Sequence, residues 1–450
     1  FPNAFNPTQS AGYSRNPARN WIVWIKKQTG VDGFRWDAVK HFSYAAQQDW
    51  SYNLKYQAGW ANGGEAMFNV GEFVGGGGTL DNYVDQVSSQ NGGSEFLMGT
   101  FDFGLRDGIK QMVSQNGGFN IGTLPDYQQG WRVAQYGAGA SAVYVHRTVP
   151  FVNNHDTFRP QVDAAGNYTG WNSGDELAPH IDPFDPRLSA AYAVAFAVDG
   201  NPQVFFEDLF NVGGTGKRFS HLPTSTTDLP VRPDLVNLIW CHQNLHFKDG
   251  AFKKRGTEPD HLIIERSTKA LIGINDNWSA WQNNTVSCDF APGTVLKDYS
   301  GANGSATVTV SSAQTVSINT PPCNGTATAG RRGYSVWAPV NIGTNYVRAA
   351  MSTTQEWELA DDLGDRDSRS LGQGGQLPAA STTWRTAGRI YVGANKTVSY
   401  NLFPSDGSRS LVVALFNAAG TQVSAQTGTG TLTGSYTPSA DGWITLRARQ

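Results

Sequence analysis

The sequence predicts a multidomain α/β plus all-β protein, in which an α/β region is followed by two antiparallel β-sandwich domains. Over about the first 250 residues, short apolar runs alternate with helix-like segments, which is the pattern of βα units. Beyond Gly250 the chain consists of short strand-like runs separated by Gly, Asn and Pro, which is typical of antiparallel sandwiches. A chain of 450 residues is long enough for about two to four domains.

Five βα units are predicted in the first region, residues 1–250. The predicted strands are 31–37, 66–71, 98–103, 148–153 and 203–206. The predicted helices are 21–28, before the first strand, and then 43–57, 106–114, 186–198 and 233–244. The Gly75–Gly78 run is predicted to be a flexible loop at the rim of a cleft. Five such units in a row fit one parallel sheet, with polar residues following the strand ends.

The rest of the chain divides into three parts. Residues 251–340 are predicted to form a sandwich with strands 261–265, 270–274, 285–290, 295–299, 306–310 and 315–318, ending near Trp337-Ala-Pro339. Residues 341–380 are mostly polar and are predicted to act as a linker. Residues 381–450 are predicted to form a second, smaller sandwich with strands 389–392, 397–402, 411–416, 431–436 and 443–447. Its Asp441-Gly442 pair is a hairpin signal.

Composition excludes several classes of protein. Apolar residues make up 39% and charged residues 16%, and the net charge is −3, which argues against disorder and against a nucleic-acid binder. No run approaches the ~20 apolar residues of a membrane span. The 51 Gly and 14 Trp suit an extracellular β-rich protein or a sugar binder, because aromatic faces stack on sugar rings, although single Trp residues are more often part of a core.

Three cysteines are too few for a disulfide framework. Cys241 follows an apolar run and is predicted to be a buried thiol, whereas Cys288 and Cys323 could pair if the protein is secreted or could stay free. The sequence opens at Phe1 with neither an initiator Met nor a signal peptide, so a processed product, an expressed part or a fragment is expected.

Two carboxylates, those of Asp37 and Glu72, are placed as the hydrolysis of a glycosidic bond would require. Retaining hydrolysis uses a nucleophile and an acid/base about 5–5.5 Å apart, best held on neighbouring strands. Asp37 ends one predicted strand and Glu72 ends the next. Alternation along the first strand places Arg35 on the face of Asp37, where it favours the ionised carboxylate that a nucleophile needs. Glu72 follows an apolar strand, which favours the protonated form of a general acid.

A third acid, Asp156, lies in the run Phe151-Val-Asn-Asn-His-Asp-Thr-Phe158. His155 and Asp156 could bind sugar hydroxyls and stabilise an oxocarbenium-like transition state. The plain alternative is that a strand-end acid caps a helix or lies on the surface, and that His155 is structural. Three acids in this order, one of them two residues after an Arg, make that alternative weak.

These segments resemble the signatures of the α-amylase family of glycoside hydrolases, in order and in spacing. The resemblance rests on Gly33-Phe-Arg-Trp-Asp-Ala-Val-Lys-His41, Gly71-Glu-Phe73 and Asn154-His-Asp156, and it covers about residues 15–340. It implies that Asp37 is the nucleophile, Glu72 the acid/base and Asp156 the transition-state stabiliser. It further implies that Arg35 and His155 bind at the cleavage site, and that Lys40 and His41 line the leaving-group side, as in α-amylases rather than α-glucosidases.

The same resemblance implies a fold, and it also indicates which parts of that fold this chain lacks. Residues 1–250 would be the C-terminal portion of a TIM (β/α)8 barrel, strands 4–8, with Gly200-Asn-Pro-Gln-Val204 matching the eighth strand and Ser335-Val-Trp-Ala-Pro339 the end of the family's sandwich. The family's Asp-x-x-x-Asn-His signature is not found, so the chain is expected to be weak or inactive alone. Calcium is expected in the parent enzyme, with the backbone carbonyl of His41 as one ligand of a site that this chain leaves incomplete.

The expected function is therefore retaining endo-hydrolysis of α-1,4-glucosidic bonds in starch or maltooligosaccharides by a secreted, monomeric enzyme that binds neither nucleic acid nor membrane. One alternative is an exo-acting, maltooligosaccharide-forming amylase. Another is a non-catalytic glucan-binding fragment, in which residues 381–450 bind sugar through Trp384, Tyr391 and Trp443. That domain could instead have only a stabilising or anchoring role.

Overall fold

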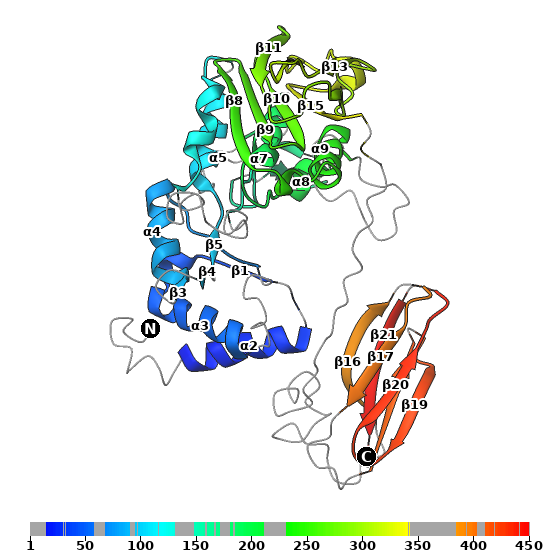
Figure 1. The fold of residues 1–450 in the computed structure, drawn as a ribbon. Coiled ribbons are helices and arrows are strands. Elements are labelled where there is room, and N and C mark those ends of the chain that lie inside the picture. The colour runs from blue at the N-terminus through cyan, green and yellow to red at the C-terminus, as the bar shows by residue number, and fades with distance from the viewer. Residues whose placement is uncertain are drawn as a thin grey trace. The chain divides into compact units, whose positions relative to one another are not determined.

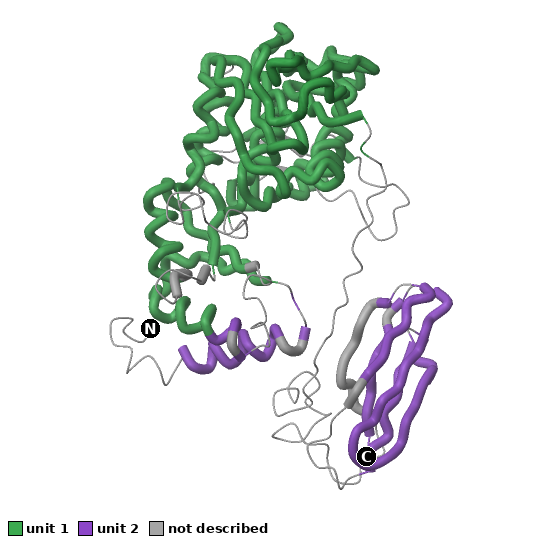
Figure 2. The backbone as a smooth tube through the Cα atoms, in the orientation of Figure 1, with its two compact units in different colours: residues 1–7, 32–52, 62–350 green, residues 8–31, 53–61, 351–450 purple. Residues whose placement is uncertain are grey.

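The structure is a computed structural model that describes residues 15–29, 31, 33–57, 68–90, 95–96, 98–115, 117–130, 148–157, 160–165, 168–171, 181–182, 185–210, 231–340, 342, 384–392, 394–402, 410–417, 419–440 and 442–449 (Figure 1). The chain divides into two compact units, residues 1–7, 32–52 and 62–350 in the first and residues 8–31, 53–61 and 351–450 in the second (Figure 2). The predicted linker 341–380 lies outside the described residues except for Ile342.

Short parallel strands form the first sheet of unit 1. The strands β1 (Gly33–Trp36), β2 (Phe68–Gly71) and β5 (Gly99–Thr100) pair in that order, β1 with β2 and β2 with β5, both parallel. A parallel bridge between Phe101 and Val149 adds the fourth predicted segment to the same edge. The chain order of the segments is therefore also their spatial order, as consecutive βα units require.

The predicted strand 203–206 is wrong as a regular strand. Asn201 and Gln203 donate their amides to the carbonyls of Thr148 and Pro150, at 2.9 Å each, so the segment does lie beside the fourth one. A parallel ladder there would also need an amide at position 150 to donate to Asn201, and proline has none. The ladder stays incomplete, and helix α8 (Phe206–Leu209) begins where the strand was expected to end.

Helices follow these segments along the chain. The structure contains α2 (Asn16–Thr29), α3 (Tyr44–Gln57), α4 (Gly77–Ser88), α5 (Phe103–Ser114), α7 (Leu188–Ala197) and α9 (Pro233–Asn244), with 3-10 turns η2 (Val39–His41), η4 (Ile121–Tyr127), η9 (Phe247–Asp249) and η10 (Thr328–Gly330). Two small hairpin-like pairs join β3 (Ser89–Gln90) to β4 (Glu95–Phe96) and β6 (Pro160–Val162) to β7 (Tyr168–Trp171). The loop predicted at Gly75–Gly78 is half helix, because Gly77 and Gly78 open α4.

The helices differ in how deeply they are buried. Every residue of α7 is buried, in keeping with its alanine-rich and largely apolar sequence. Its core joins α5, α9 and the sandwich strands β9 (His261–Arg266) and β10 (Ala270–Ile274) in one cluster. At the start of α5 the carboxylate of Asp102 accepts a hydrogen bond from the amide of Leu105 at 3.0 Å, a normal N-cap.

The sandwich of unit 1 consists of antiparallel strands. Six of them, β8 (Phe252–Glu258), β9, β10, β12 (Val295–Asp298), β13 (Thr307–Thr309) and β15 (Tyr334–Pro339), form one sheet in the order β13-β12-β15-β10-β9-β8. The strands β11 (Gln282–Ser287) and β14 (Thr315–Thr320) form a second sheet. Side chains of both sheets, among them Leu271 and Ile318, share one buried cluster around Trp337.

A buried ion pair fastens the α/β part of unit 1 to its sandwich. Arg266 of β9 contacts Asp199 with its Nη1 atom at 2.8 Å from the carboxylate, and both side chains are almost fully buried. The Nε atom of Arg266 donates to the carbonyl of Phe247 at 2.8 Å. Because the charges are paired and hydrogen-bonded, their burial is tolerated, and the two parts form one packed body.

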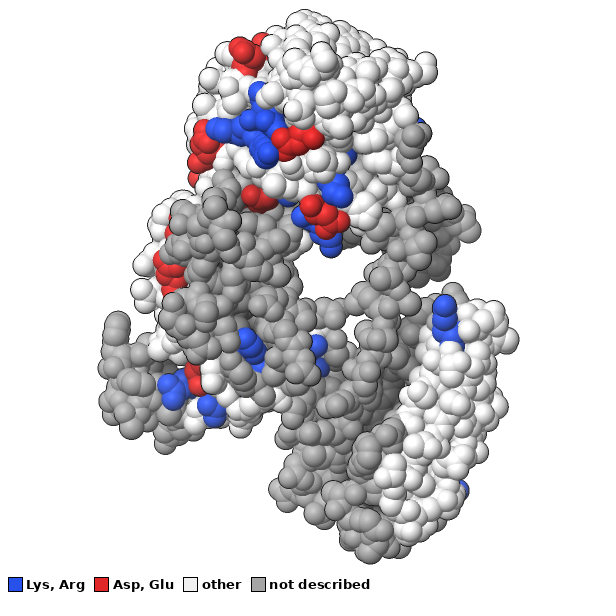
Figure 3. Space-filling view, in the orientation of Figure 1, with Lys and Arg blue, Asp and Glu red and all other residues white. Residues whose placement is uncertain are grey.

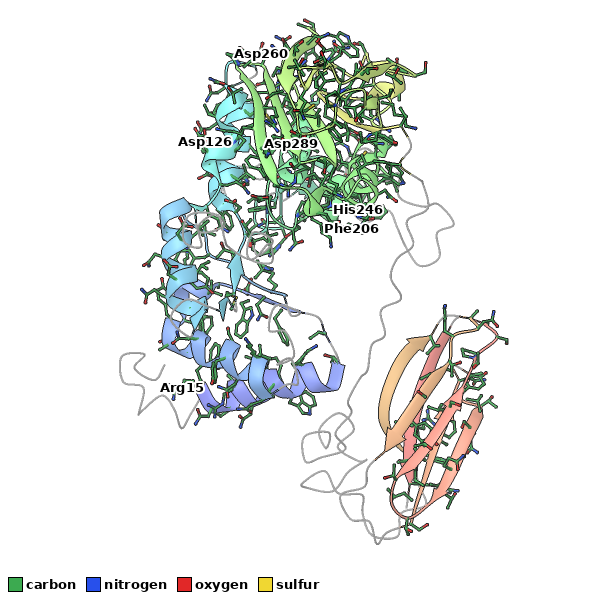
Figure 4. The ribbon with its side chains drawn as sticks, in the orientation of Figure 1. Arg15, Asp126, Phe206, His246, Asp260 and Asp289 are labelled. Carbon is green, nitrogen blue, oxygen red and sulfur yellow. The ribbon has the colours of Figure 1, made fainter. Side chains whose placement is uncertain are left out.

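Charged side chains of the edge strand β8 form several ion pairs. Lys253 and Arg255 both pair with Asp289, Arg255 also pairs with the buried Glu265 at 2.7 Å, and Lys254 contacts Asp126 at 2.7 Å. Figure 3 shows positive groups bordered by negative ones in this part of unit 1, and Figure 4 labels Asp126 and Asp289 near β8. The hydrogen bonds from Lys253, Ser267 and Arg255 lower the pKa of Asp289 from 3.8 to about 2.

Asp289→Asn is expected to lower the Tm of unit 1 by about 2–4 °C at pH 7, the shift that about 1 kcal/mol gives in a body of this size. A carboxyl whose pKa is lower in the folded state stabilises folding above its unfolded pKa and loses that contribution as the pH falls. The difference from the parent should therefore shrink between about pH 4 and pH 2. Calorimetry across this range checks it, with exposed Glu258→Gln as the control; a Tm difference that does not depend on pH would contradict it.

Unit 2 contains the second antiparallel sandwich. The strands β16 (Arg385–Val392), β21 (Gly442–Arg449), β18 (Leu411–Phe416) and β19 (Gln422–Gly428) form one sheet in that order, and β17 (Val398–Leu402) pairs with β20 (Leu432–Tyr436). The predicted hairpin at Asp441-Gly442 is wrong, because β20 and β21, the strands that flank it, belong to different sheets. The side chain of Trp384 is half-buried against Phe416 and Arg449. The side chains of Tyr391 and Trp443 lie outside the described residues.

The three cysteines are buried and free of disulfides. Cys288 and Cys323 do not pair, because Cys288 lies in the sandwich core whereas Cys323 packs with the α7 cluster. The thiol of Cys323 donates to the carbonyl of Asn275 at 3.0 Å. Burial raises the pKa of Cys241 above its usual range, as expected for an inert thiol. Among the described helices, none has both the length and the apolarity needed to cross a membrane.

Candidate active site

Asp37 and Glu72 follow neighbouring strands at the same edge of the sheet. The last register pair of β1 and β2 is Trp36 with Gly71, so the next residue of each strand carries a carboxylate. The amide of Glu72 donates to the carbonyl of Trp36 at 2.8 Å, and the amide of Val39 donates to the carbonyl of Glu72 at 3.2 Å. The pairing thus continues past the strand ends, and it holds the two acids side by side.

The turn after Asp37 is fixed by the Glu72 side chain. Its Oε2 atom accepts a hydrogen bond from the amide of Ala38 at 2.9 Å. Ala38 has a left-handed backbone, with φ 48° and ψ 38°, which costs a non-glycine residue on the order of 1 kcal/mol. The strained turn is therefore held by the second carboxylate, so that the position of Asp37 depends on Glu72.

The two acids differ in exposure. Glu72 is buried, with a relative exposure of 6%. The side chain of Asp37 is 74% exposed, and its Oδ1 atom lies 2.9 Å from the Nη2 atom of Arg35. The guanidinium of Arg35 also lies over the ring of Phe101, 5.8 Å from its centroid, so it is oriented from the third strand's end. One acid is open to a ligand, and the other is kept from bulk water.

Lys40 and His41 lie on η2, directly after the strained turn, and both are exposed. The amide of His41 donates to the carbonyl of Ala38 at 3.0 Å. Their side chains are accessible to a ligand bound over Asp37, and they do not pack in the core next to the sheet.

The loop with the third acid is organised by its own side chains. The amide oxygen of Asn154 accepts hydrogen bonds from the amides of Asp156 and Thr157, at 2.9 Å each. The hydroxyl of Thr157 accepts from the amide of Asn154 at 2.9 Å. His155 Nε2 lies 3.2 Å from the Oδ2 atom of Asp156, with the histidine 58% exposed. The side chain of Asp156 is less exposed, at 21%.

A buried network beneath this loop was not predicted. The side-chain amide of Asn153 donates to the carbonyl of Ile181 at 2.9 Å and to Asp208 at 3.2 Å. The hydroxyl of Tyr192 donates to the same carboxylate at 2.7 Å. Burial raises the pKa of Asp208 from 3.8 to about 6. Asp208 lies 55 residues after Asn153, so no local pattern could have connected them.

The predicted residues therefore form two groups. Arg35, Asp37 and Glu72 make one group at the ends of β1 and β2, and His155 and Asp156 make the other after the fourth segment. Aromatic rings join the supports of the two groups, since Phe101 packs edge-on against Phe151 with centroids 5.7 Å apart. All five residues lie at carboxyl ends of parallel segments, the edge at which ligands bind in such sheets.

The described residues do not form a metal site. Nowhere among them do three or more His, Cys, Asp or Glu side chains lie together so that they could hold an ion. The predicted ligand, the carbonyl of His41, would supply only one of the ~6–8 oxygens that calcium takes. Calcium binding by the whole protein stays a prediction.

The chain is similar in sequence to several curated proteins, although no family model matches it. The chain is 25% identical over 203 residues to an α-amylase of Bacillus licheniformis, covering 44% of this chain and 32% of that protein. It is 25% identical over 278 residues to a cyclomaltodextrin glucanotransferase of Niallia circulans, covering 60% and 32% respectively. The chain thus spans about a third of the length of these curated relatives.

Among solved structures, the crystal structure of an Anoxybacillus α-amylase is similar in fold. Its TM-score with this chain is 0.50 at 17% identity, and the match covers 74% of this chain and 64% of that one. The likeness supports the coarse architecture, an α/β region followed by β domains.

Proposed function

We propose that this chain, a member of the α-amylase family, carries the nucleophile and the acid/base of a retaining α-1,4-glucan hydrolase. The observation that supports this most is the pairing of Asp37 and Glu72 at the ends of adjacent parallel strands. Neighbouring strands lie about 4.8 Å apart, which is close to the ~5–5.5 Å between the carboxyl groups of retaining glycosidases. The wider separation of an inverting enzyme does not suit this pair.

In the proposed mechanism the exposed Asp37 attacks the anomeric carbon while Glu72 protonates the departing glycosidic oxygen. The covalent glycosyl-enzyme is then hydrolysed by a water molecule that gives its proton to Glu72. Arg35 orients Asp37 through their ion pair. Positive charge develops on the sugar ring in both transition states, and the negative Asp156 stabilises it.

Around these acids, four residues bind the substrate in the proposal. Arg35 and His155 contact the sugar at the cleavage site, and the exposed Lys40 and His41 contact the leaving-group side. Hydrogen bonds from such groups to sugar hydroxyls position the bond to be cleaved.

The two groups of residues must come closer than a flat sheet allows. Three strand steps separate β1 from the segment at 149, which corresponds to about 14 Å in a flat sheet. Curvature toward a closed barrel shortens this separation and turns the strand ends inward. We therefore propose that residues 1–250 belong to a (β/α)8 barrel as strands 4–8, and that residues 251–340 and 381–450 are its accessory sandwiches.

The proposed substrates are starch and maltooligosaccharides, attacked internally by a secreted monomer. The test is to incubate the protein that carries these residues with soluble starch and to follow reducing ends and their configuration by NMR. Products released first as α-anomers support the proposal, whereas β-anomers would point to inversion. We expect weak release or none from the 450-residue chain alone, because five parallel segments among the described residues do not close a barrel.

A second candidate is transglycosylation. One of the relatives, a protein from Niallia circulans, is a cyclomaltodextrin glucanotransferase. The glycosyl-enzyme at Asp37 would then react with a sugar hydroxyl instead of water. Cyclic products in mass spectra of the starch digest would favour this candidate, and linear products of one fixed length would favour the exo-acting alternative. Starch binding without any product would favour a glucan-binding fragment.

A further inference from the structure

A cavity of about 550 Å³ lies in unit 1, away from the residues of the candidate active site. Gly117, Arg187, Asn277 and Trp278 line it. These residues come from the turn after α5, from the start of α7 and from the loop 275–281 between β10 and β11. The volume lies in the range of about 300–1,000 Å³ that is typical of small-molecule sites.

The loop 275–281 is held in place by asparagine side chains. The Oδ1 atom of Asn275 accepts from the amide of Asn277 at 2.9 Å, and its Nδ2 atom donates to the carbonyl of Ala280 at 2.9 Å. The Oδ1 atom of Asn277 in turn accepts from the amides of Ser279 and Ala280, at 3.1 and 2.9 Å. The loop is therefore preorganised, and a ligand would not have to order it.

This fixed loop exposes two tryptophans. Trp278 is 50% exposed and Trp281 is 42% exposed. One exposed tryptophan is common on a protein surface. Two of them on one hydrogen-bonded loop, one of which lines a cavity, present apolar ring surface on a backbone that is already ordered, and such a surface is suited to binding.

Polar groups surround the ring of Trp278. The guanidinium of Arg187 lies 5.8 Å from its centroid and donates through Nε to the carbonyl of Asp276 at 2.9 Å. The side-chain amide of Asn277 is turned to Asp260, at 3.0 Å. At Gly117 the φ of +87° disfavours any residue with a side chain, although a Cβ atom there would make only an ordinary contact with Arg187 Nη2, at 3.6 Å.

We propose that this cavity is a binding site for a short α-glucan segment. The choice of an α-glucan rests on the proposed function, whereas the aromatic and polar groups indicate a sugar ligand in general. The apolar face of a pyranose ring stacks on an indole, and a guanidinium group binds the hydroxyls at its edge. A site away from the cleft would keep a polymer attached between cleavage events and so raise its effective concentration at the acids.

The test uses the chain with Glu72→Gln, so that glucan binding is read without turnover. Fluorine-labelled tryptophan gives one NMR signal per indole, and the signal lost in Trp278→Phe identifies Trp278. Titration with maltoheptaose is expected to shift that signal and to leave the signal of the exposed Trp21 in place. A Trp278 signal that does not move at saturating maltoheptaose overturns the proposal.

Retention on starch granules gives the second readout. Trp278→Ala is expected to weaken it about tenfold, Trp278→Phe less, and Trp21→Ala not at all. Unchanged retention for Trp278→Ala, or an equal loss on cellulose, overturns the assignment of an α-glucan site. Neither readout requires hydrolysis, so a failure of the proposed catalysis would be seen separately in the starch digest.

Discussion

In a protein that carries these residues within a closed barrel, Glu72→Gln is expected to lower the turnover of soluble starch by about 10²–10⁴-fold, the contribution of a general acid/base. The amide preserves the size of the side chain, and its oxygen can still accept the hydrogen bond from Ala38 that fixes the turn. It cannot deliver a proton to the glycosidic oxygen. Reducing-end release at equal protein concentration measures the effect, with the exposed Glu258→Gln as a matched control.

A fluoride substrate separates the roles of the two carboxylates. Fluoride leaves from a glycosyl fluoride without protonation, so Glu72→Gln should retain the first step on α-maltosyl fluoride far better than on starch. Asp37→Asn removes the nucleophile and should lose activity on both substrates. If Glu72→Gln lost both activities equally, or if Asp37→Asn kept either one, the assigned roles would be contradicted.

The sequence predicts elements best where one local signal dominates. Helix α9 has the predicted bounds because Pro233 opens it at the first turn, and β18 is an apolar run that is buried at all but one position. The polar strands β8 and β19 were not predicted, since they lie at sheet edges with mostly exposed side chains. The strand predicted at 203–206 is not formed, because helix α8 begins at Phe206 and because Pro150, in another segment, has no amide to donate to Asn201 just before it.

The residues of the candidate site also divide into those that the sequence predicts and those that it does not. Asp37, Arg35 and Glu72 are predictable because strand alternation and the order of βα units place them without knowledge of the whole fold. The partners of Asn153 are not, since Asp208 and Tyr192 come from later segments that only packing brings together. Trp384 shows why exposed binding residues are hard to predict from sequence, because its ring packs against Phe416 and Arg449, which belong to other strands.

The second large expected effect is a loss of stability, and it concerns the buried network of Asn153, Tyr192 and Asp208. Asp208→Ala removes the acceptor of the Tyr192 hydroxyl and of the Asn153 amide, and leaves two buried donors unsatisfied at about 1–3 kcal/mol each. The stability of unit 1 should therefore fall by about 2–5 kcal/mol. Denaturant unfolding measures this loss. Starch turnover should fall as well, because Asn153 anchors the loop that carries Asp156. A variant with parent stability would show that the network does not support the fold.

Asp208→Asn tests the charge separately from the packing. Burial raises the pKa of Asp208 to about 6, while Arg232 lowers it and Glu207 raises it to a smaller extent. The folded state thus binds the proton more tightly than the unfolded state, so stability from this group is full below about pH 4 and declines as the pH rises to about 6. Asparagine does not titrate. The Tm of Asp208→Asn relative to the parent should therefore rise between pH 4 and pH 7, and a constant or falling difference would show that Asp208 is ionised throughout and is held by Tyr192 and Asn153 as a buried charge.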